Sequence, residues 1–124
     1  MIQVPRAALL AFAERRPGCG KHVIEEGAAF QLSVYRLEPG ARVPRHAHTS
    51  SHDIFVGIEG EVRIEAEGDA PAFSLGPGGV CSMAPGTAHE VVNAHATLAA
   101  LFVLVHAPFD RFDVVPSDGA VSRR

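Results

Sequence analysis

Residues 40–60 read GARVPRHAHTSSHDIFVGIEG, and this stretch places His46 and His48 on either side of one alanine. On a β-strand, side chains at positions i and i+2 point to the same face, so both imidazoles can reach one ion. Asp53 begins the apolar run that follows, and Gly60 predicts a turn at the far end of that run. The pattern therefore predicts two neighbouring strands that bring two imidazoles and a carboxylate to one site.

A second stretch, residues 78–93, reads GGVCSMAPGTAHEVVN and places His89 just after a Pro-Gly turn. Three histidines and one carboxylate suit one divalent ion per chain, with Fe(II) favoured and Mn, Ni, Zn or Cu as alternatives. Such a site normally leaves one or two positions for water or substrate. The predicted ligands are His46, His48, Asp53 and His89.

His52 is a rival to Asp53 as the fourth ligand. Alternation along the strand places His52 on the face opposite Asp53, which favours Asp53. A bulge between Ser50 and Asp53 would reverse that ranking.

Most of the remaining chain is typical of short strands separated by turn residues. With 12 glycines and nine prolines, it predicts a single all-β domain over residues 1–124, either a sandwich or a barrel. The predicted strands are His22–Glu26, Phe30–Glu38, Arg42–His48, Asp53–Glu59, Glu61–Glu67, Ala72–Leu75, Gly79–Ala84, Ala88–Asn93 and Thr97–His106.

The two ends of the chain have different patterns. Residues 5–16 predict a short amphipathic helix, because Pro5 suits a first helical turn and Pro17-Gly18 would end it. The polar tail, residues 117–124, is expected to be loose.

The two histidine-bearing stretches together resemble the cupin family. The first cupin motif, G-x5-H-x-H-x(3,4)-E-x6-G, matches Gly40, His46, His48, Asp53 and Gly60. The second, G-x5-P-x-G-x2-H-x3-N, matches Gly78, Ala84, Gly86, His89 and Asn93. The resemblance covers residues 30–106 and implies a double-stranded β-helix, a jelly-roll barrel whose core spans residues 22–108, with a metal near one mouth. It also implies a homodimer.

Two positions depart from the cupin pattern. Aspartate stands at position 53 where the motif has glutamate, and Ala84 replaces the motif proline. Asp53 is one methylene shorter than glutamate, so it reaches a metal less easily. Cupins that lack the carboxylate bind metal through three histidines and tend to be oxygen-using enzymes, so the resemblance shifts the expected reaction toward that class.

Several residues outside the ligand set are candidates for a substrate pocket. Phe55 and Gly57 share a face with Asp53, and Gly57, having no side chain, would leave room for a ligand. Arg42 alternates in step with His46 and His48, so it could meet an anionic substrate on the same face. Either Tyr35 or Arg36 faces inward from an earlier strand. By contrast His22, His95 and His106 are expected to be ordinary strand or turn residues, and Cys81 an inert buried thiol.

Composition excludes several functional classes. The net charge of −3 leaves no basic footprint for nucleic acid or an anionic membrane. The longest apolar run, residues 98–105, is far shorter than the ~20 residues that a membrane-spanning helix needs. The N-terminus lacks a signal-peptide cleavage pattern, and two cysteines make no disulfide framework, so a cytoplasmic protein is expected.

These features predict a metal-dependent enzyme that acts on a small organic molecule. With Fe(II) it would be a dioxygenase, and with the other metals an isomerase or lyase that uses the ion as a Lewis acid. The alternative is a non-catalytic cupin module that binds or senses a small molecule or a metal.

Overall fold

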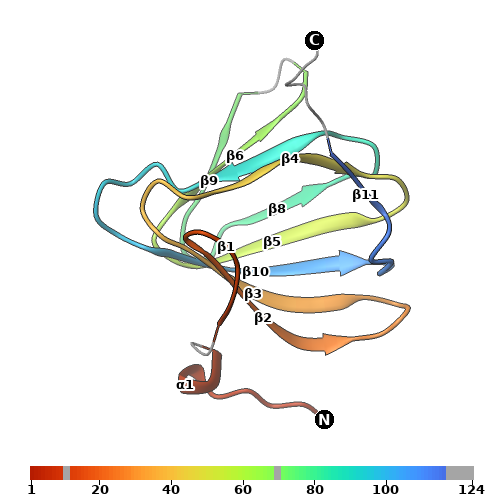
Figure 1. The fold of residues 1–124 in the computed structure, drawn as a ribbon, viewed down its shortest axis with the longest axis horizontal. Coiled ribbons are helices and arrows are strands. Elements are labelled where there is room, and N and C mark those ends of the chain that lie inside the picture. The colour runs from red at the N-terminus through yellow and green to blue at the C-terminus, as the bar shows by residue number, and fades with distance from the viewer. Residues whose placement is uncertain (10–11, 69–70, 117–124) are drawn as a thin grey trace.

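The computed structural model describes residues 1–9, 12–68 and 71–116. Within these residues the chain is mostly β, with one short helix, α1 (Arg6–Leu9), and eleven strands. Two antiparallel sheets face each other as a jelly roll (Figure 1). None of the helical structure in the described ranges is long and apolar enough to cross a membrane.

Each sheet mixes strands that are distant in the sequence. The larger sheet has the order β1 (Ala13–Arg16), β2 (Cys19–Glu26), β3 (Gln31–Leu37), β10 (Ala100–Ala107), β5 (His52–Glu59) and β8 (Val80–Met83). The smaller has the order β11 (Val114–Pro116), β4 (Arg42–His48), β9 (His89–Val92), β6 (Val62–Ala66) and β7 (Phe73–Leu75). β4 has the predicted bounds, and the other eight predicted strands each overlap an observed one.

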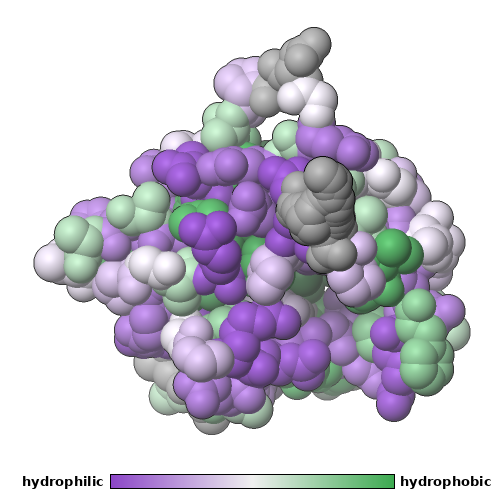
Figure 2. Space-filling view, turned by 45° about the horizontal axis from the view of Figure 1, so that its top comes forward, coloured by the Kyte–Doolittle hydropathy of each residue, from purple (hydrophilic) through white to green (hydrophobic). Residues whose placement is uncertain are grey.

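Apolar side chains from both sheets fill the space between them. Leu37, Phe55 and Phe102 belong to the larger sheet, and Ile64 and Val91 to the smaller; all are buried. Burying each such side chain stabilises the fold by roughly 1.5–3 kcal/mol. The face drawn in Figure 2 is mostly hydrophilic, with hydrophobic residues in small separate groups, as expected once the apolar residues have packed inside.

Asn93, the last residue of the second motif, joins the end of β9 to the larger sheet. The side chain is fully buried, and its Nδ2 donates to the backbone carbonyls of Leu37, at 3.0 Å, and Leu98, at 2.9 Å. Its Oδ1 accepts a hydrogen bond from the backbone N–H of His95 at 3.0 Å. A buried amide needs such partners, and this explains why an asparagine suits this corner.

The N-terminal segment corrects one prediction. The helix expected over residues 5–16 is helical only in α1, and Ala13–Arg16 form strand β1 on the edge of β2. An isolated 12-residue helix is marginal in water, whereas the open edge of β2 offers backbone partners. Pro17-Gly18, which suggested a helix end, lies in the turn between β1 and β2, where Gly18 has a φ of 77°. Residues 10–11 of that predicted helix, and the predicted tail 117–124, lie outside the described residues.

Candidate metal centre and cavity

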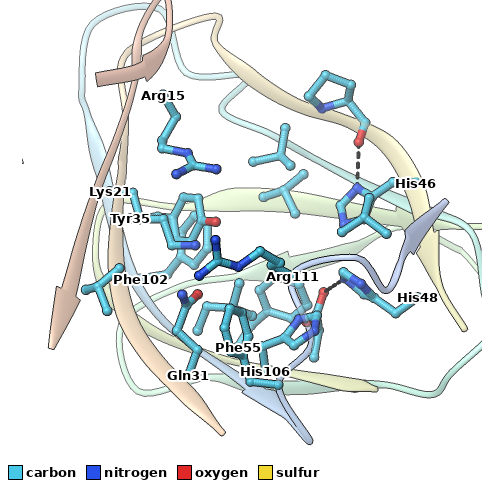
Figure 3. Close-up of a pocket in the computed structure, with 18 of the residues that line it drawn as sticks. Arg15, Lys21, Gln31, Tyr35, His46, His48, Phe55, Phe102, His106 and Arg111 are labelled. Atoms are coloured by element: carbon cyan, nitrogen blue, oxygen red, sulfur yellow. Dashed lines mark hydrogen bonds and ion pairs between the residues drawn. The ribbon is translucent and has the colours of Figure 1, made fainter. Parts of the chain in front are cut away.

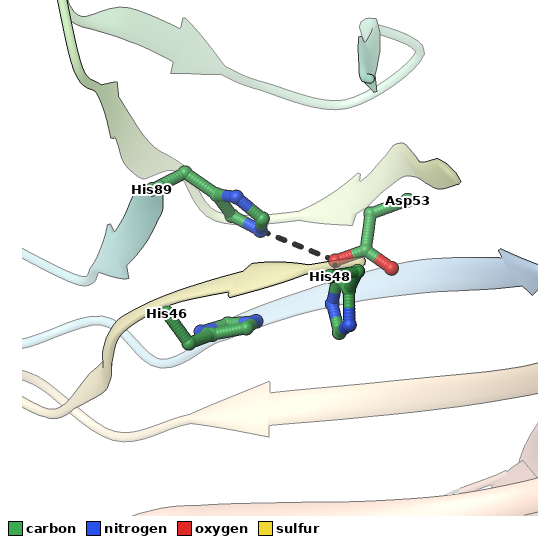
Figure 4. A group of neighbouring side chains, drawn as sticks. All are labelled: His46, His48, Asp53 and His89. Carbon is green, nitrogen blue, oxygen red and sulfur yellow. Dashed lines mark hydrogen bonds and ion pairs between the residues drawn. The ribbon is translucent and has the colours of Figure 1, made fainter. Parts of the chain in front are cut away.

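The four predicted ligand side chains come together between the two sheets (Figure 4). His46 and His48 extend from β4, Asp53 from β5 and His89 from the start of β9. Their candidate ligand atoms all lie within 4.8 Å of one another. The structure therefore places all four residues as the sequence predicts, while a bound metal stays a prediction.

Strand pairing and one turn explain why the histidines meet. His46 pairs directly with His89 between β4 and β9, and His48 lies two residues farther along the same face. Gly86 has a φ of 82°, a conformation that favours glycine, and its N–H donates to the carbonyl oxygen of His48 at 2.7 Å. The Pro-Gly turn is thus fastened to β4, and it directs His89 toward the other imidazoles.

Backbone carbonyls orient two of the imidazoles. Nδ1 of His46 lies 2.8 Å from the carbonyl oxygen of Pro44, and Nδ1 of His89 lies 2.9 Å from that of Thr87. A carbonyl oxygen can only accept, so each Nδ1 carries the proton and donates it. In a neutral imidazole this leaves the lone pair on Nε2, and it is the arrangement that outer partners of metal-bound histidines usually impose.

Burial lowers the pKa of His46 to about 4, and the hydrogen bond to Pro44 opposes this shift only in part. His46 is therefore neutral at pH 7, with its Nε2 lone pair free to bind a cation.

Asp53 is the carboxylate at the centre of the cluster, and only 2% of it is exposed. Its Oδ2 lies 2.9 Å from Nε2 of His48 and 3.2 Å from Nε2 of His89, and its Oδ1 lies 2.9 Å from Nδ1 of His106. Burial alone would raise its pKa, but hydrogen bonds from His106 and His48, together with the contact to His89, outweigh burial and hold the pKa far below its usual range. Asp53 is therefore ionised.

The contact between His89 and Asp53 shows that this cluster suits a cation. Because Nδ1 of His89 donates to Thr87, Nε2 carries a proton toward Asp53 only when this imidazole is cationic; in the neutral imidazole Nε2 and the carboxylate oxygen, 3.2 Å apart, are two acceptors that repel each other. A proton or a divalent cation shared between them turns that repulsion into attraction. Three imidazole nitrogens and one carboxylate oxygen are donors that suit a first-row divalent transition metal, so the residues present fit such an ion.

His106, expected to be an ordinary strand residue, is part of the same cluster. In the β5–β10 pair it stands directly opposite Asp53, and it donates to the carboxylate oxygen that the other histidines do not contact. Its ring is 4.3 Å from that of His48. In the sequence, His106 alternates in step with Phe102 and Leu104, so the three side chains point to the same face of their strand. This observation identifies His106 as a site residue only once β10 is known to pair with β5.

Asp113 is a second buried carboxylate that the sequence pattern does not predict. It lies just before β11 and accepts hydrogen bonds from the backbone N–H groups of Thr49, Ser50 and Ser51, the turn that joins β4 to β5. Burial opposes ionisation, yet hydrogen bonding by the side chains of Ser51 and Thr49 and by the backbone of Ser50 and Thr49 holds the pKa of Asp113 well below its usual range. Its Oδ2 also lies 3.9 Å from Nε2 of His106. Asp113 therefore supports the turn that separates two of the predicted ligands.

A cavity of about 640 Å³ opens beside the cluster and is lined by His46, His48, Asp53 and His106 (Figure 3). Tyr35, Phe55, Phe102 and Leu104 supply apolar surface, and Gln31 supplies an amide. The rings of Tyr35 and Phe102 are stacked, with their centroids 5.3 Å apart and an interplanar angle of 2°. The volume falls within the range of small-molecule sites, ~300–1,000 Å³.

The structure places the predicted pocket residues in different surroundings. Phe55 and Tyr35 line the cavity. Arg42 does not, because it is exposed and pairs with Glu90 on the neighbouring strand at 3.0 Å. Arg36 pairs with Glu38 at 2.6 Å and also lies outside the lining. His52 is exposed on the face opposite Asp53, as alternation predicts.

The prediction that Gly57 leaves space for a ligand is wrong. A Cβ atom built on Gly57 would stand 2.0 Å from the carbonyl oxygen of Gly76, which already occupies that space. The glycine permits backbone to pack against backbone, and it does not line the cavity. The cavity is lined by Phe55 of the same strand instead.

Comparison with known proteins assigns the fold. A profile of the family described as "Cupin domain" matches residues 33–106. The chain belongs to this family. A search of curated protein sequences found no match.

Solved structures share this cupin fold. A Thermus thermophilus protein aligns with a TM-score of 0.75 and 25% identity, over 87% of this chain and 98% of its own. KdgF from a Halomonas species aligns with a TM-score of 0.72 and 19% identity, over 82% of this chain and 88% of its own. A cupin-superfamily sugar phosphate isomerase from Silicibacter pomeroyi aligns with a TM-score of 0.65 and 24% identity, over 73% of this chain and 60% of its own. At these identities the likeness shows the fold, whereas the chemistry depends on this chain's own residues.

Proposed function

We propose that this cupin is a metal-dependent enzyme that acts on a small organic molecule, with the ion as a Lewis acid in an isomerase or lyase reaction. One observation carries the proposal: three imidazoles and an ionised carboxylate converge within 4.8 Å beside a cavity of small-molecule size. His46, His48, His89 and Asp53 would hold the ion. When bound, the ion would polarise an oxygen atom of the substrate and stabilise the negative charge that develops there.

The residues around the ion have separable tasks. Pro44 and Thr87 fix the imidazole orientations, and His106 holds the second oxygen of Asp53, so the donor atoms are arranged before any ligand enters. Phe55, Phe102 and Leu104 exclude water from the adjoining part of the cavity. Burial raises the pKa of Tyr35 to about 12, so this phenol keeps its proton and acts as a hydrogen-bond donor.

A dioxygenase reaction is the competing enzyme proposal. The shortened carboxylate at position 53 favours that class if the residue fails to join the ligand set. In the structure Asp53 lies inside the cluster. Its position supports a metal held by three histidines and one aspartate, and therefore the Lewis-acid proposal. The likeness to a sugar phosphate isomerase adds only a shared fold to that proposal.

The decisive experiment compares metal retention in two histidine variants. Wild type, His48→Ala and His52→Ala would each be loaded anaerobically with Fe(II), Mn(II) or Zn(II), desalted and analysed by mass spectrometry. His48 lies in the cluster, while His52, four residues away, is exposed and serves as the matched control. We expect near-stoichiometric metal in wild type and His52→Ala, and little in His48→Ala.

Three outcomes would change the proposal. Unchanged metal retention in His48→Ala would refute the ligand set. Absence of retained metal in wild type would leave the non-catalytic binding module as the better description. Oxygen consumption by the Fe(II) form with small diketones, thiols or phenols would favour the dioxygenase over the isomerase or lyase.

A further inference from the structure

The cavity has a positively charged side that the metal proposal leaves unexplained. Five basic residues line the cavity, against three acidic ones, although the whole chain has a net charge of −3. The basic residues are Arg15, Arg16, Lys21, Arg45 and Arg111, and the acidic ones are Glu26, Asp53 and Asp110.

The acidic residues are already engaged elsewhere. Asp53 contacts three histidines at hydrogen-bond distance, as described above. Oε1 of Glu26 accepts a hydrogen bond from Gln31 at 2.7 Å, and Oδ1 of Asp110 accepts one from the backbone N–H of Phe112 at 2.9 Å. None of the three forms an ion pair with a basic residue of the cavity, although the charges of Glu26 and Asp53 partly offset the lowering of the Lys21 pKa.

Four of the five basic residues lack a carboxylate partner. Arg45 lies 3.6 Å from Glu90. By contrast, Arg15, Arg16, Lys21 and Arg111 form no ion pair with any residue in the described ranges. The three arginines are exposed, so water screens their charges, whereas Lys21 is half-buried. Because all four line one cavity, an anion bound there would be attracted by each of them.

Strand register and one loop direct the side chains of Arg15, Lys21 and Arg111 toward the cavity (Figure 3). Lys21 pairs across the sheet with Tyr35, which pairs in turn with Phe102, so the three share the inner face. The ammonium nitrogen of Lys21 lies 5.3 Å from the centroid of the Tyr35 ring. Arg15 occupies the irregular position of β1, between Glu14 and Arg16, and Arg111 enters from the loop between β10 and β11.

We propose that Arg15, Lys21 and Arg111 bind the carboxylate or phosphate group of a small organic ligand whose other end reaches the histidine cluster. The second half of this statement rests on the function proposed above; the first half does not. Guanidinium groups bind carboxylate and phosphate oxygens in pairs, and an ammonium adds a point charge. A substrate held at its anionic end would be oriented with its reacting end toward the metal donors.

The remaining lining suits the middle of such a ligand. Along the inner face of the larger sheet, Tyr35 and Phe102 lie between Lys21 on β2 and strand β5, which carries Asp53, so a short carbon chain or ring can pack on them. The Gln31 amide and the Tyr35 hydroxyl supply neutral hydrogen bonds near this path.

The protonation behaviour of Lys21 agrees with an anion site. Burial lowers its pKa to about 8, and the nearby charge of Arg15 lowers it further in the same direction. A bound anion would oppose both effects and raise that pKa. Lys21 is the only lysine in the sequence, so its ammonium can be followed selectively.

The test uses metal-free protein, treated with a chelator, and two probes of similar size. Phenyl phosphate carries an anionic group on a ring, whereas benzyl alcohol carries none. Binding is followed by two-dimensional NMR of the backbone amides. The variant is Lys21→Gln/Arg111→Gln. The matched control is Arg42→Gln/Arg63→Gln, which also removes two positive charges, at exposed arginines that pair with glutamates outside the cavity.

We expect phenyl phosphate to bind wild type and the control with equal affinity, to shift the amides of Lys21 and Tyr35, and to bind the double variant on the order of tenfold more weakly. Benzyl alcohol should bind weakly to all three proteins. Equal affinity for both probes, no binding of phenyl phosphate to wild type, or equal affinity in the two variants would each overturn the anion site. The wild-type comparison of probes holds even if the double variant folds poorly.

Failure of this proposal is distinguishable from failure of the metal proposal. The anion measurement contains no metal, and the double variant leaves every residue of the histidine cluster in place. If His48→Ala retains its metal while phenyl phosphate binding behaves as expected, the metal proposal is wrong and the anion site stands. If the double variant retains metal but binds phenyl phosphate like the control, only the anion site is wrong.

Discussion

The two sides of the cavity handle charge in opposite ways. On the histidine side a single ionised carboxylate, Asp53, is surrounded by imidazoles that donate to it or share a cation with it. On the basic side, Arg15, Lys21 and Arg111 face the cavity without a carboxylate partner. The histidine side is thus arranged around its charge, whereas the basic side carries unpaired positive charge that a bound anion would balance. Removing a charge should therefore have opposite consequences on the two sides.

The largest effect is expected for Asp53→Asn. The amide has almost the shape of the carboxylate but not its charge, so the three imidazoles lose their shared anionic partner. Metal affinity should fall on the order of 100-fold, because the change removes both a donor and the group that orients the others. Metal retention after dialysis measures this. Asp110→Asn, an exposed aspartate of the same cavity, is the control and should retain metal as wild type does. If Asp53→Asn retains as much metal as wild type, the carboxylate is not a metal ligand and serves only as a hydrogen-bond partner of the histidines.

Asp113→Asn tests the support behind that side. The carboxylate accepts three backbone N–H groups from the β4–β5 turn, and charge-assisted hydrogen bonds contribute ~1.5–3 kcal/mol each. Because an amide oxygen still accepts some of them, we expect the free energy of unfolding to fall by about 2–3 kcal/mol at pH 7, as measured by urea denaturation. A loss below about 0.5 kcal/mol would mean that the turn holds its shape without Asp113.

The pH dependence of the same variant sharpens the prediction. The folded-state pKa of Asp113 lies below the ordinary value of 3.8, so the folded protein binds fewer protons than the unfolded chain below about pH 4. The contribution of Asp113 is therefore fully present above that pH and is lost as the pH falls toward the folded-state pKa. The stability difference between wild type and Asp113→Asn should shrink between about pH 4 and pH 2.

His106→Ala should have a smaller effect than Asp53→Asn, since His106 acts through Asp53 and is a positioning residue. Loss of such an outer partner typically lowers metal affinity 10–100-fold, and we expect about tenfold here. His106→Asn places an amide N–H where Nδ1 donates, so it should restore much of the affinity. Equal losses in both variants would indicate that the imidazole packs against its neighbours rather than orienting the carboxylate.

Part of the histidine side could be predicted from sequence because its information is local. His46 and His48 are two residues apart on one strand, and Asp53 begins the next strand after a short turn. Strand alternation and turn geometry fix these relations. His89 joins them because β9 pairs with β4, and its placement beside the other histidines came from the resemblance to cupins. The order of strands in the sheets likewise came from the resemblance to cupins and not from the alternation itself.

The residues that were missed depend on pairing between distant segments. His106 meets Asp53 because β10 pairs with β5, and Asp113 meets a turn more than 60 residues earlier in the chain. The sequence places Arg15 in a helix, because Pro5 suits a first helical turn and Pro17-Gly18 would end it, and only the open edge of β2 favours a strand. Gly57 failed for a related reason, since the backbone that fills its space comes from residue 76.

The smallest effect, and the one with the opposite sign, is expected for Lys21→Met. Methionine keeps the length and apolar stem of the side chain but removes a half-buried ammonium that has no carboxylate partner. The ligand-free protein should therefore gain stability at pH 7, by up to about 1 kcal/mol once solvent screening is allowed for.

Between about pH 8 and the ordinary value of 10.5, folded wild type has released the Lys21 proton while the unfolded chain retains it. Wild-type stability consequently rises with pH across that window, and its deficit relative to Lys21→Met should close. Arg63→Gln, an exposed arginine outside the cavity, is the control and should show neither the gain nor the pH dependence. If Lys21→Met is instead less stable than wild type at every pH, the contact of the ammonium with the Tyr35 ring outweighs its burial, and the basic side is balanced without a ligand.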